Sequence, residues 1–283
     1  MKKQIRRSIL LFSSLFLTGS ALLLSSHLNA SEQSPLAEVY DYKIYYDAPT
    51  PERLQAMTDY DLMIIEPVYY SQAQIEQIQE SGTLVYGYIN TMEADRWNTE
   101  LFNQLNDDDF FIRDGERVYY SEWDSFLTDI TSTHYQNVLS KEVEKQIVDK
   151  GLDGAFLDTV GNIDNEHHHD SGLLQDQREG MADWMASVKD EHPDLSLMQN
   201  WGFDTLTTAT SPYVDGIMWE SFHFSNLVAD EWAQDQIFKL RKVREQQGVE
   251  VFTVSQKEGS ESTSLARANR FKHYHSPESY NEW

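Results

Sequence analysis

One short segment, Gly151–Asn162 (GLDGAFLDTVGN), constrains the fold of this chain more than any other. Its small and apolar residues 154–157 lead directly into the carboxylate of Asp158. Such a run is typical of a buried parallel strand, and an acid at its end is where a (β/α)8 barrel places its chemistry. The pattern returns in 215–220 (DGIMWE), which ends in Glu220. Each acid alone is equally compatible with a helix cap or an arginine pair, but two strand-end carboxylates are the minimum for cleaving a glycosidic bond.

Strand-like apolar runs alternate with helical patterns along the chain. We expect eight strands, at 42–46, 62–65, 84–90, 126–130, 154–158, 195–199, 216–220 and 249–254. Helices are predicted between them, at 72–79, 133–150, 175–192 and 227–246, with a last one at 262–271. This alternation predicts an α/β fold, a single-domain (β/α)8 TIM barrel with right-handed crossovers. A doubly wound open sheet is the alternative, but the loop after Tyr46 lacks the glycines of its phosphate-binding turn.

Two parts of the chain depart from this alternation. Residues 1–30 combine a basic start, an apolar core and a small residue at position 30, which predicts a signal peptide followed by the barrel at 31–283. A membrane anchor is the competing interpretation, but the apolar run is short for a span of about 20 residues. Residues 95–122 form an irregular excursion, with a small hairpin expected at 117–120, and loops of this length are usually functional.

Charge and cysteine content limit the partners. The chain has 22 Lys and Arg against 47 Asp and Glu, a net charge of −25, and it contains no cysteine. A field of that sign repels nucleic acid and anionic membrane surfaces and attracts cationic ligands. Without cysteine there is no disulfide framework. Together with the predicted signal peptide, these features lead us to expect a secreted or cell-surface monomer that is not inserted in a membrane after signal cleavage.

Carboxylates, amides and aromatic rings recur at the predicted strand ends. Carboxylates and amides bind sugar hydroxyls, and aromatic faces stack on sugar rings. We expect Asp158 and Glu220 to be catalytic, with substrate bound by Asp47, Glu93, Asp129, Asn200, Trp201 and Trp219. Structural hydrogen bonding is an equally good explanation for Glu93 and Asp129, and any single aromatic residue is more often a packing residue.

Five motifs, in this order, resemble glycoside hydrolase family 114, the endo-α-1,4-polygalactosaminidases. They are GYINTMEA at 87–94, FLTD at 126–129, GLDGAFLD at 151–158, MQN at 198–200 and GIMWES at 216–221. The resemblance implies a barrel that uses Asp158 and Glu220 as its catalytic pair, needs no cofactor, and acts on a galactosamine-containing, partly cationic polysaccharide. The segment 162–170 departs from the family pattern, which leaves the substrate open.

Roles within the pair follow from two-carboxylate chemistry, in which one acid is protonated and the other ionised. We assign Asp158 as nucleophile or base and Glu220 as general acid. The run His167–His169 raises the alternative of a metal site for deacetylase-like hydrolysis. Consecutive residues of an extended loop point in alternate directions, so we expect a solvated loop at 162–170 and no metal. A catalytically silent glycan-binding barrel is the other alternative.

Overall fold

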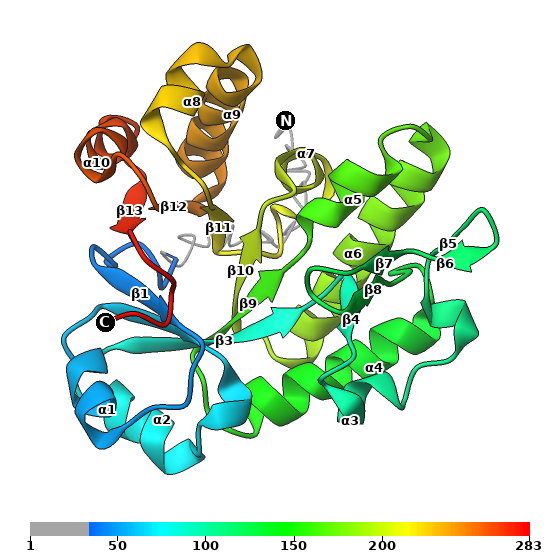
Figure 1. Ribbon diagram of the computed structural model, residues 1–283, viewed down its shortest axis with the longest axis horizontal. Helices are drawn as coiled ribbons and strands as arrows, with labels where there is room; N and C mark the ends of the chain where they lie inside the picture. Colours follow the sequence, from blue (N-terminus) through cyan, green and yellow to red (C-terminus); the bar gives the residue numbers. More distant parts are fainter. Residues whose placement is uncertain (1–33) are drawn as a thin grey trace, which may run out of the picture. The chain divides into compact units, whose positions relative to one another are not determined.

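The computed structural model describes residues 34–283, so the predicted signal peptide lies outside the described residues. Eight parallel strands form one sheet in the order β1-β2-β3-β9-β10-β11-β12-β13, which curls into a nearly closed barrel (Figure 1). The strands are β1 (Tyr42–Tyr45), β2 (Leu62–Ile65), β3 (Leu84–Asn90), β9 (Gly154–Asp158), β10 (Ser196–Asn200), β11 (Gly216–Trp219), β12 (Glu250–Ser255) and β13 (Lys272–His275). The predicted (β/α)8 barrel is confirmed.

Side chains alternate along every barrel strand between the barrel interior and the surrounding helices, as the pleat of a strand requires. In β1, Tyr42 and Ile44 point inward, and in β9 Phe156 does so. Residues of the opposite parity, such as Leu157 and Trp219, pack against the helices. This parity decides below which strand-end residues reach the site.

Helices cover the outside of the barrel (Figure 1). They are α1 (Pro51–Met57), α2 (Gln72–Gln79), α3 (Thr99–Phe102), α4 (Thr133–Val143), α5 (Gly161–His167), α6 (Ser171–Glu191), α7 (Phe203–Thr205), α8 (Phe224–Ala229), α9 (Glu231–Gln247) and α10 (Gly259–Ala268). Local signals set their ends: Thr50 caps α1 ahead of Pro51, Ser71 and Gln74 form a capping box on α2, and Gly248 ends α9 at φ +78°. Within residues 34–283, no helix is long and apolar enough to cross a bilayer.

The expected strand at 126–130 is not part of the barrel. Its residues form β8 (Ser125–Leu127), which pairs antiparallel with β4 (Glu93–Asp95) and β7 (Tyr119–Tyr120). A separate hairpin, β5 (Ile112–Arg113) with β6 (Glu116–Arg117), extends from this insertion, a few residues before the hairpin expected at 117–120. The insertion therefore lies between barrel strands β3 and β9 and replaces a short loop at the C-terminal ends of the strands.

The eighth barrel strand is β13, which was not predicted. Its sequence, Lys-His-Tyr-His, is polar and partly exposed, so it lacks the apolar run of a strand buried on both faces. The segment 162–170 also differs from expectation, because most of it is helix α5 instead of a loop. The helix expected at 227–246 is divided at Asp230, whose side chain caps α9.

Candidate active site

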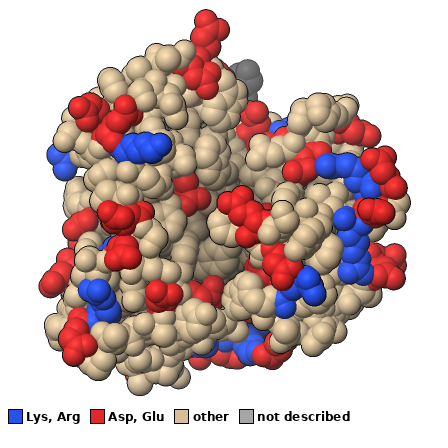
Figure 2. Space-filling view, viewed as in Figure 1, with Lys and Arg blue, Asp and Glu red and all other residues tan. Residues whose placement is uncertain are grey.

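A cavity of about 1210 Å³ opens at the C-terminal ends of the barrel strands. Figure 2 shows it as a hollow with acidic side chains on its walls and with Lys and Arg on the surrounding surface. Among the described residues 34–283, no Lys or Arg lines it. The carboxylates in its lining are those of eight residues, Glu66, Glu93, Asp95, Glu122, Asp158, Asp164, Asp204 and Glu220. The local field in the cavity therefore favours cationic groups.

Strand parity explains which residues line the cavity. Asp158 lies two residues after the inward-facing Phe156, and Asn200 lies two residues after the inward-facing Met198. Glu220 follows Met218 at the same spacing. The polar end residues thus continue the inward-facing rows of the barrel core, which places them side by side over its top.

Asp158 and Glu220 are joined by one amide. The Nδ2 atom of Asn200 donates to Asp158 Oδ1 at 2.7 Å and to Glu220 Oε2 at 2.8 Å. The two oxygens are separated by no more than the sum of these distances, about 5.5 Å. Burial, followed by the charge of Asp158, raises the pKa of Glu220 above its ordinary value. The two acids are therefore held close together, and Glu220 retains its proton more readily than an exposed glutamate.

The residue after each of these three polar groups has a left-handed backbone. Thr159 has φ +64°, Trp201 has φ +56° and Ser221 has φ +57°. Non-glycine residues adopt this region at a cost, and a β-branched threonine does so rarely. Three such residues at the ends of the neighbouring strands β9, β10 and β11 indicate that the chain turns sharply there to hold the polar side chains in place. Backbone strain of this kind is concentrated at functional sites.

Ser221→Gly is expected to stabilise the protein. Removing the left-handed strain gains about 1–3 kcal/mol, and the entropy of the added glycine offsets about 0.5–1 kcal/mol of it. The Tm should rise by about 2–4 °C for each net kcal/mol, measured by calorimetry. Ser264→Gly, at an exposed position within α10, is the control and should lower the Tm. An equal loss in both variants would contradict the strain at Ser221.

A second row of acids lies beside Asp158. The carboxylate of Glu93 accepts hydrogen bonds from Asn162 Nδ2 at 2.8 Å and from Ser125 Oγ, and burial raises its pKa. The carboxylate of Asp95 accepts from Asn90 Nδ2 at 2.9 Å, and burial raises its pKa to about 6. Glu93 lines the cavity, and the insertion strand β4 brings it there.

Three predicted substrate-binding residues do not line the cavity. Asp47 follows the inward-facing Tyr46 and so has the opposite parity. Trp219 points outward from β11 and is buried among aromatic rings, 4.8 Å from Phe203 between centroids. Asp129 lies in the insertion, where its Oδ1 accepts from Gln177 Nε2 at 2.7 Å and from Thr131. Asp47 is exposed, whereas the contacts of Trp219 and Asp129 are those of structural residues.

Aromatic rings line both sides of the cavity. Trp97 and Trp123 come from the insertion and are more than half exposed, whereas the predicted Trp201 stacks on Phe203 at 5.1 Å. Tyr88 and Tyr280 also line the cavity, and neither was predicted. The inward parity of β3 could have identified Tyr88. No local pattern marks Tyr280, which lies beyond the last predicted helix.

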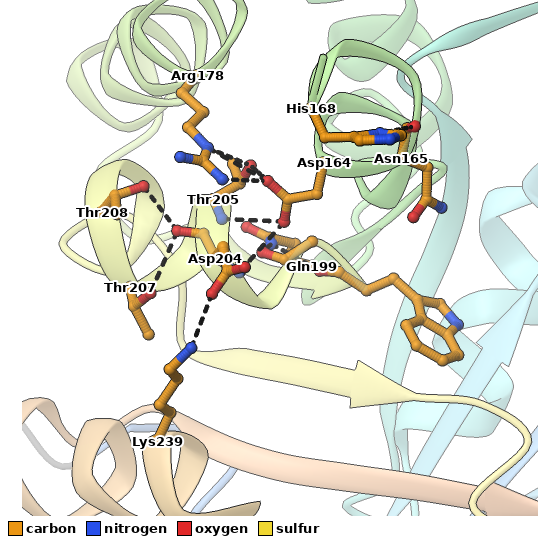
Figure 3. Close-up of polar contacts among 12 residues, drawn as sticks. Asp164, Asn165, His168, Arg178, Gln199, Asp204, Thr205, Thr207, Thr208 and Lys239 are labelled. Atoms are coloured by element: carbon orange, nitrogen blue, oxygen red, sulfur yellow. Dashed lines mark hydrogen bonds and ion pairs between the residues drawn. The ribbon is translucent and has the colours of Figure 1, made fainter. Parts of the chain in front are cut away.

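Two of the eight carboxylates are neutralised by cations behind the cavity wall (Figure 3). Asp164 on α5 pairs with Arg178 at 2.6 Å and accepts from the backbone and hydroxyl of Thr205. Asp204 pairs with Lys239 at 3.1 Å. These contacts link α5 to α6 and α7, and α7 to α9, behind this wall of the cavity.

The three consecutive histidines do not converge on one point. His167 is buried with its ring 4.6 Å from that of Phe111, whereas His168 lies at the cavity wall with its ring 3.6 Å from the tilted ring of His169. Among residues 34–283, no group of three or more His, Cys, Asp or Glu residues is arranged to hold a metal ion. His167 is the last residue of α5, and His168 and His169 lie in the turn that follows it.

A barrel with two carboxylates held close together at the C-terminal ends of its strands is the architecture of many glycosidases. The model of glycoside-hydrolase family GH114 matches residues 25–276, and the chain belongs to this family and is a glycosidase. No curated protein sequence matches it.

Solved structures of similar fold are also glycoside hydrolases. The glycoside hydrolase domain of PelA from Pseudomonas aeruginosa has a TM-score of 0.67 at 17% identity, over 86% of this chain and 97% of that one. Ega3 from Aspergillus fumigatus, solved in complex with galactosamine, has a TM-score of 0.62 at 16% identity, over 83% and 90%. An α-galactosidase from Thermus thermophilus has a TM-score of 0.56 at 14% identity, over 87% and 60%. At these identities the likeness concerns the fold.

Proposed function

We propose that this protein is an exported endo-acting glycosidase that cleaves a cationic, galactosamine-containing polysaccharide. The observation that carries the proposal is the charge of the cavity around Asp158 and Glu220. Within residues 34–283, only two of its eight carboxylates form ion pairs with Lys or Arg. A protonated amine on each sugar would supply the missing positive charge. The galactosamine bound in the Ega3 structure supports the same substrate class.

The chemistry follows from the environments of the two acids. The ionised Asp158 attacks the anomeric carbon while the protonated Glu220 gives its proton to the leaving glycosidic oxygen, which breaks the bond and forms a glycosyl ester on Asp158. Glu220, now ionised, takes a proton from water, and the hydroxide attacks the anomeric carbon and releases Asp158. The raised pKa of Glu220 supports its assignment as the acid.

The short separation of the acids supports retention of anomeric configuration. Retaining glycosidases hold their carboxyl groups about 5–5.5 Å apart, whereas inverting ones leave about 6.5–9.5 Å for a water molecule. The bridge through Asn200 limits the two oxygens to the shorter range. Cleavage of an α-linked polymer should therefore release the α anomer first, which NMR of fresh digests measures.

Digestion of α-1,4-linked galactosamine polymer tests the proposal. The deacetylated polymer should release soluble oligosaccharides faster than the fully acetylated one, because only the free amines are cationic. This preference should shrink as salt rises from low to about 0.5 M, since screening weakens attraction to the exposed carboxylates. Equal rates on both polymers would refute charge recognition. Binding without release from either polymer would identify a glycan-binding barrel.

A further inference from the structure

The barrel is not closed by a hydrogen-bonded ladder. β1 and β13 are the two ends of the strand order, so the seam between them depends on other contacts. Side chains bridge the seam: Lys43 Nζ donates to Tyr274 Oη at 2.8 Å, and the rings of Tyr42 and Tyr274 lie 5.7 Å apart. After β13, residues 276–283 leave the sheet and run beside β1 (Figure 1). We call residues 276–283 the tail.

The tail substitutes for a neighbouring strand along β1. The backbone N–H of Tyr46 donates to Asn281 Oδ1 at 2.9 Å. The ammonium of Lys43, which is 5% exposed, donates to the Glu282 carbonyl at 2.7 Å. A buried ammonium needs such acceptors, since burying one without them is costly. β1 therefore has binding groups for the tail on both its backbone and its side chains.

Trp283 anchors the tail. Its ring lies edge-on to Tyr45 at 5.7 Å and to Tyr60 at 5.8 Å. The cations of Lys43 and Arg53 lie over it, each 5.1 Å from the ring centre. Aromatic pairs stabilise a contact beyond the area they bury, and cation–π contacts add to this. The tail is thus fixed to β1 and to the region around α1.

The same tail brings Tyr280 to the catalytic pair. The hydroxyl of Tyr280 donates to Glu220 Oε1, while Asn200 Nδ2 donates to Glu220 Oε2. The ring of Tyr280 packs edge-on to Tyr46 at 5.9 Å. We propose that the tail is a clasp that closes the β1–β13 seam and holds Tyr280 as the positioning residue for Glu220. This inference rests on the catalytic role proposed for Glu220.

The two partners of Glu220 have different chemistry. An amide NH2 only donates, so Asn200 keeps Oε2 as an acceptor, and the acidic proton belongs on Oε1. A tyrosine hydroxyl both donates and accepts. Tyr280 can therefore donate to the ionised carboxylate and, after rotation of its hydroxyl hydrogen, accept from the protonated acid. It orients Oε1 in both states of the catalytic cycle.

An NMR titration of Glu220 tests this inference without requiring turnover. In protein labelled with ¹³C at glutamate carboxyl carbons, the signal that disappears in Glu220→Gln is that of Glu220. In Tyr280→Phe it should titrate about 1 pH higher than in wild type, because both hydrogen bonds are lost and the one to the ionised form is the stronger. Tyr40→Phe, at an exposed tyrosine outside the cavity, is the control. An unchanged titration in Tyr280→Phe would overturn the positioning role.

Variants at Trp283 test the clasp itself. Trp283→Ala should move the Glu220 titration in the same direction as Tyr280→Phe, while Trp283→Phe should retain the wild-type value. A Trp283→Ala protein that is folded by circular dichroism and titrates like wild type would refute the clasp. On a cleaved substrate, Tyr280→Phe should lower kcat roughly 10- to 100-fold and change KM little. Absence of all cleavage in wild type would refute the proposed function. The NMR titration would still show whether Tyr280 contacts Glu220.

Discussion

Asp158→Asn is expected to reduce turnover by at least about 10³-fold while the protein still binds its polysaccharide. The substitution preserves the size and the hydrogen-bonding position of the side chain but removes the nucleophilic charge. Asn200 would then donate to an amide oxygen in place of a carboxylate. Release of oligosaccharide measures turnover, and calorimetric titration with a non-cleaved oligomer measures binding.

Asp190→Asn, at an exposed position on α6, is the matched control and should keep wild-type turnover. Both variants should have wild-type Tm values within about 2 °C. Wild-type turnover in Asp158→Asn would exclude Asp158 from the chemistry. Loss of both binding and stability would instead identify it as a structural residue.

The wild-type protein is expected to lose stability as the pH rises from about 4.5 to 7, and Glu66→Gln is expected to lose less. Glu66 ends the inward-facing row of β2 and lines the cavity. Burial raises its pKa from 4.5 to about 7. The folded state therefore keeps a proton that the unfolded chain releases, and stability falls with rising pH through this interval.

The size of the effect follows from the shift. Each pH unit of pKa shift corresponds to about 1.4 kcal/mol in the free energy of unfolding. A single group with these pKa values therefore contributes roughly 3 kcal/mol of stability below pH 4.5, and this contribution is lost by about pH 8. Glutamine keeps the acceptor for the Val68 amide, which Glu66 caps at 3.5 Å, and it does not ionise. The free energy of unfolding, from urea titrations at pH 5 and pH 8, should therefore vary less in the variant.

Glu80→Gln, at an exposed position just after α2, is the control and should have the pH dependence of wild type. Asp95 faces the same cavity with a pKa of about 6, so part of the wild-type slope belongs to it. Identical pH dependence in Glu66→Gln and wild type would show that Glu66 does not titrate in this range.

The strand-end acids could be predicted because their signal is local. An apolar run followed by a carboxylate marks both a buried strand and its end, and this located Asp158 and Glu220. The side-chain parity of the same runs also separates Trp219, which packs outside the barrel, and Asp47, which does not line the cavity, from the inward-facing rows. Counting two residues forward from the inward-facing core residues selects Asp158, Asn200 and Glu220 and leaves out both, although Trp201, one residue after Asn200, lines the cavity.

The β8 segment shows where local pattern fails. Phe126 and Leu127 belong to a strand, as predicted, but that strand pairs with β4 and β7 because the insertion supplies them as partners. The eighth strand of the barrel is instead β13. Its polar sequence is tolerated because it pairs with β12 on one side only, while the tail and Lys43 cover the seam on its other side. Which strand a segment pairs with therefore depends on residues that are distant in the sequence.

By itself the sequence determined the alternating α/β pattern, the (β/α)8 class and the two acids that follow its buried strands, since burial and turn signals act over a few residues. Only the tertiary structure decided that Asn200 bridges those acids, that the insertion brings Glu93 and Trp97 to the cavity, and that Tyr280 reaches Glu220. The contacts of Asn200 and Tyr280 with the two acids join residues 20 to 60 positions apart in the chain. Closure of the barrel brings them together, and no short-range pattern encodes that closure.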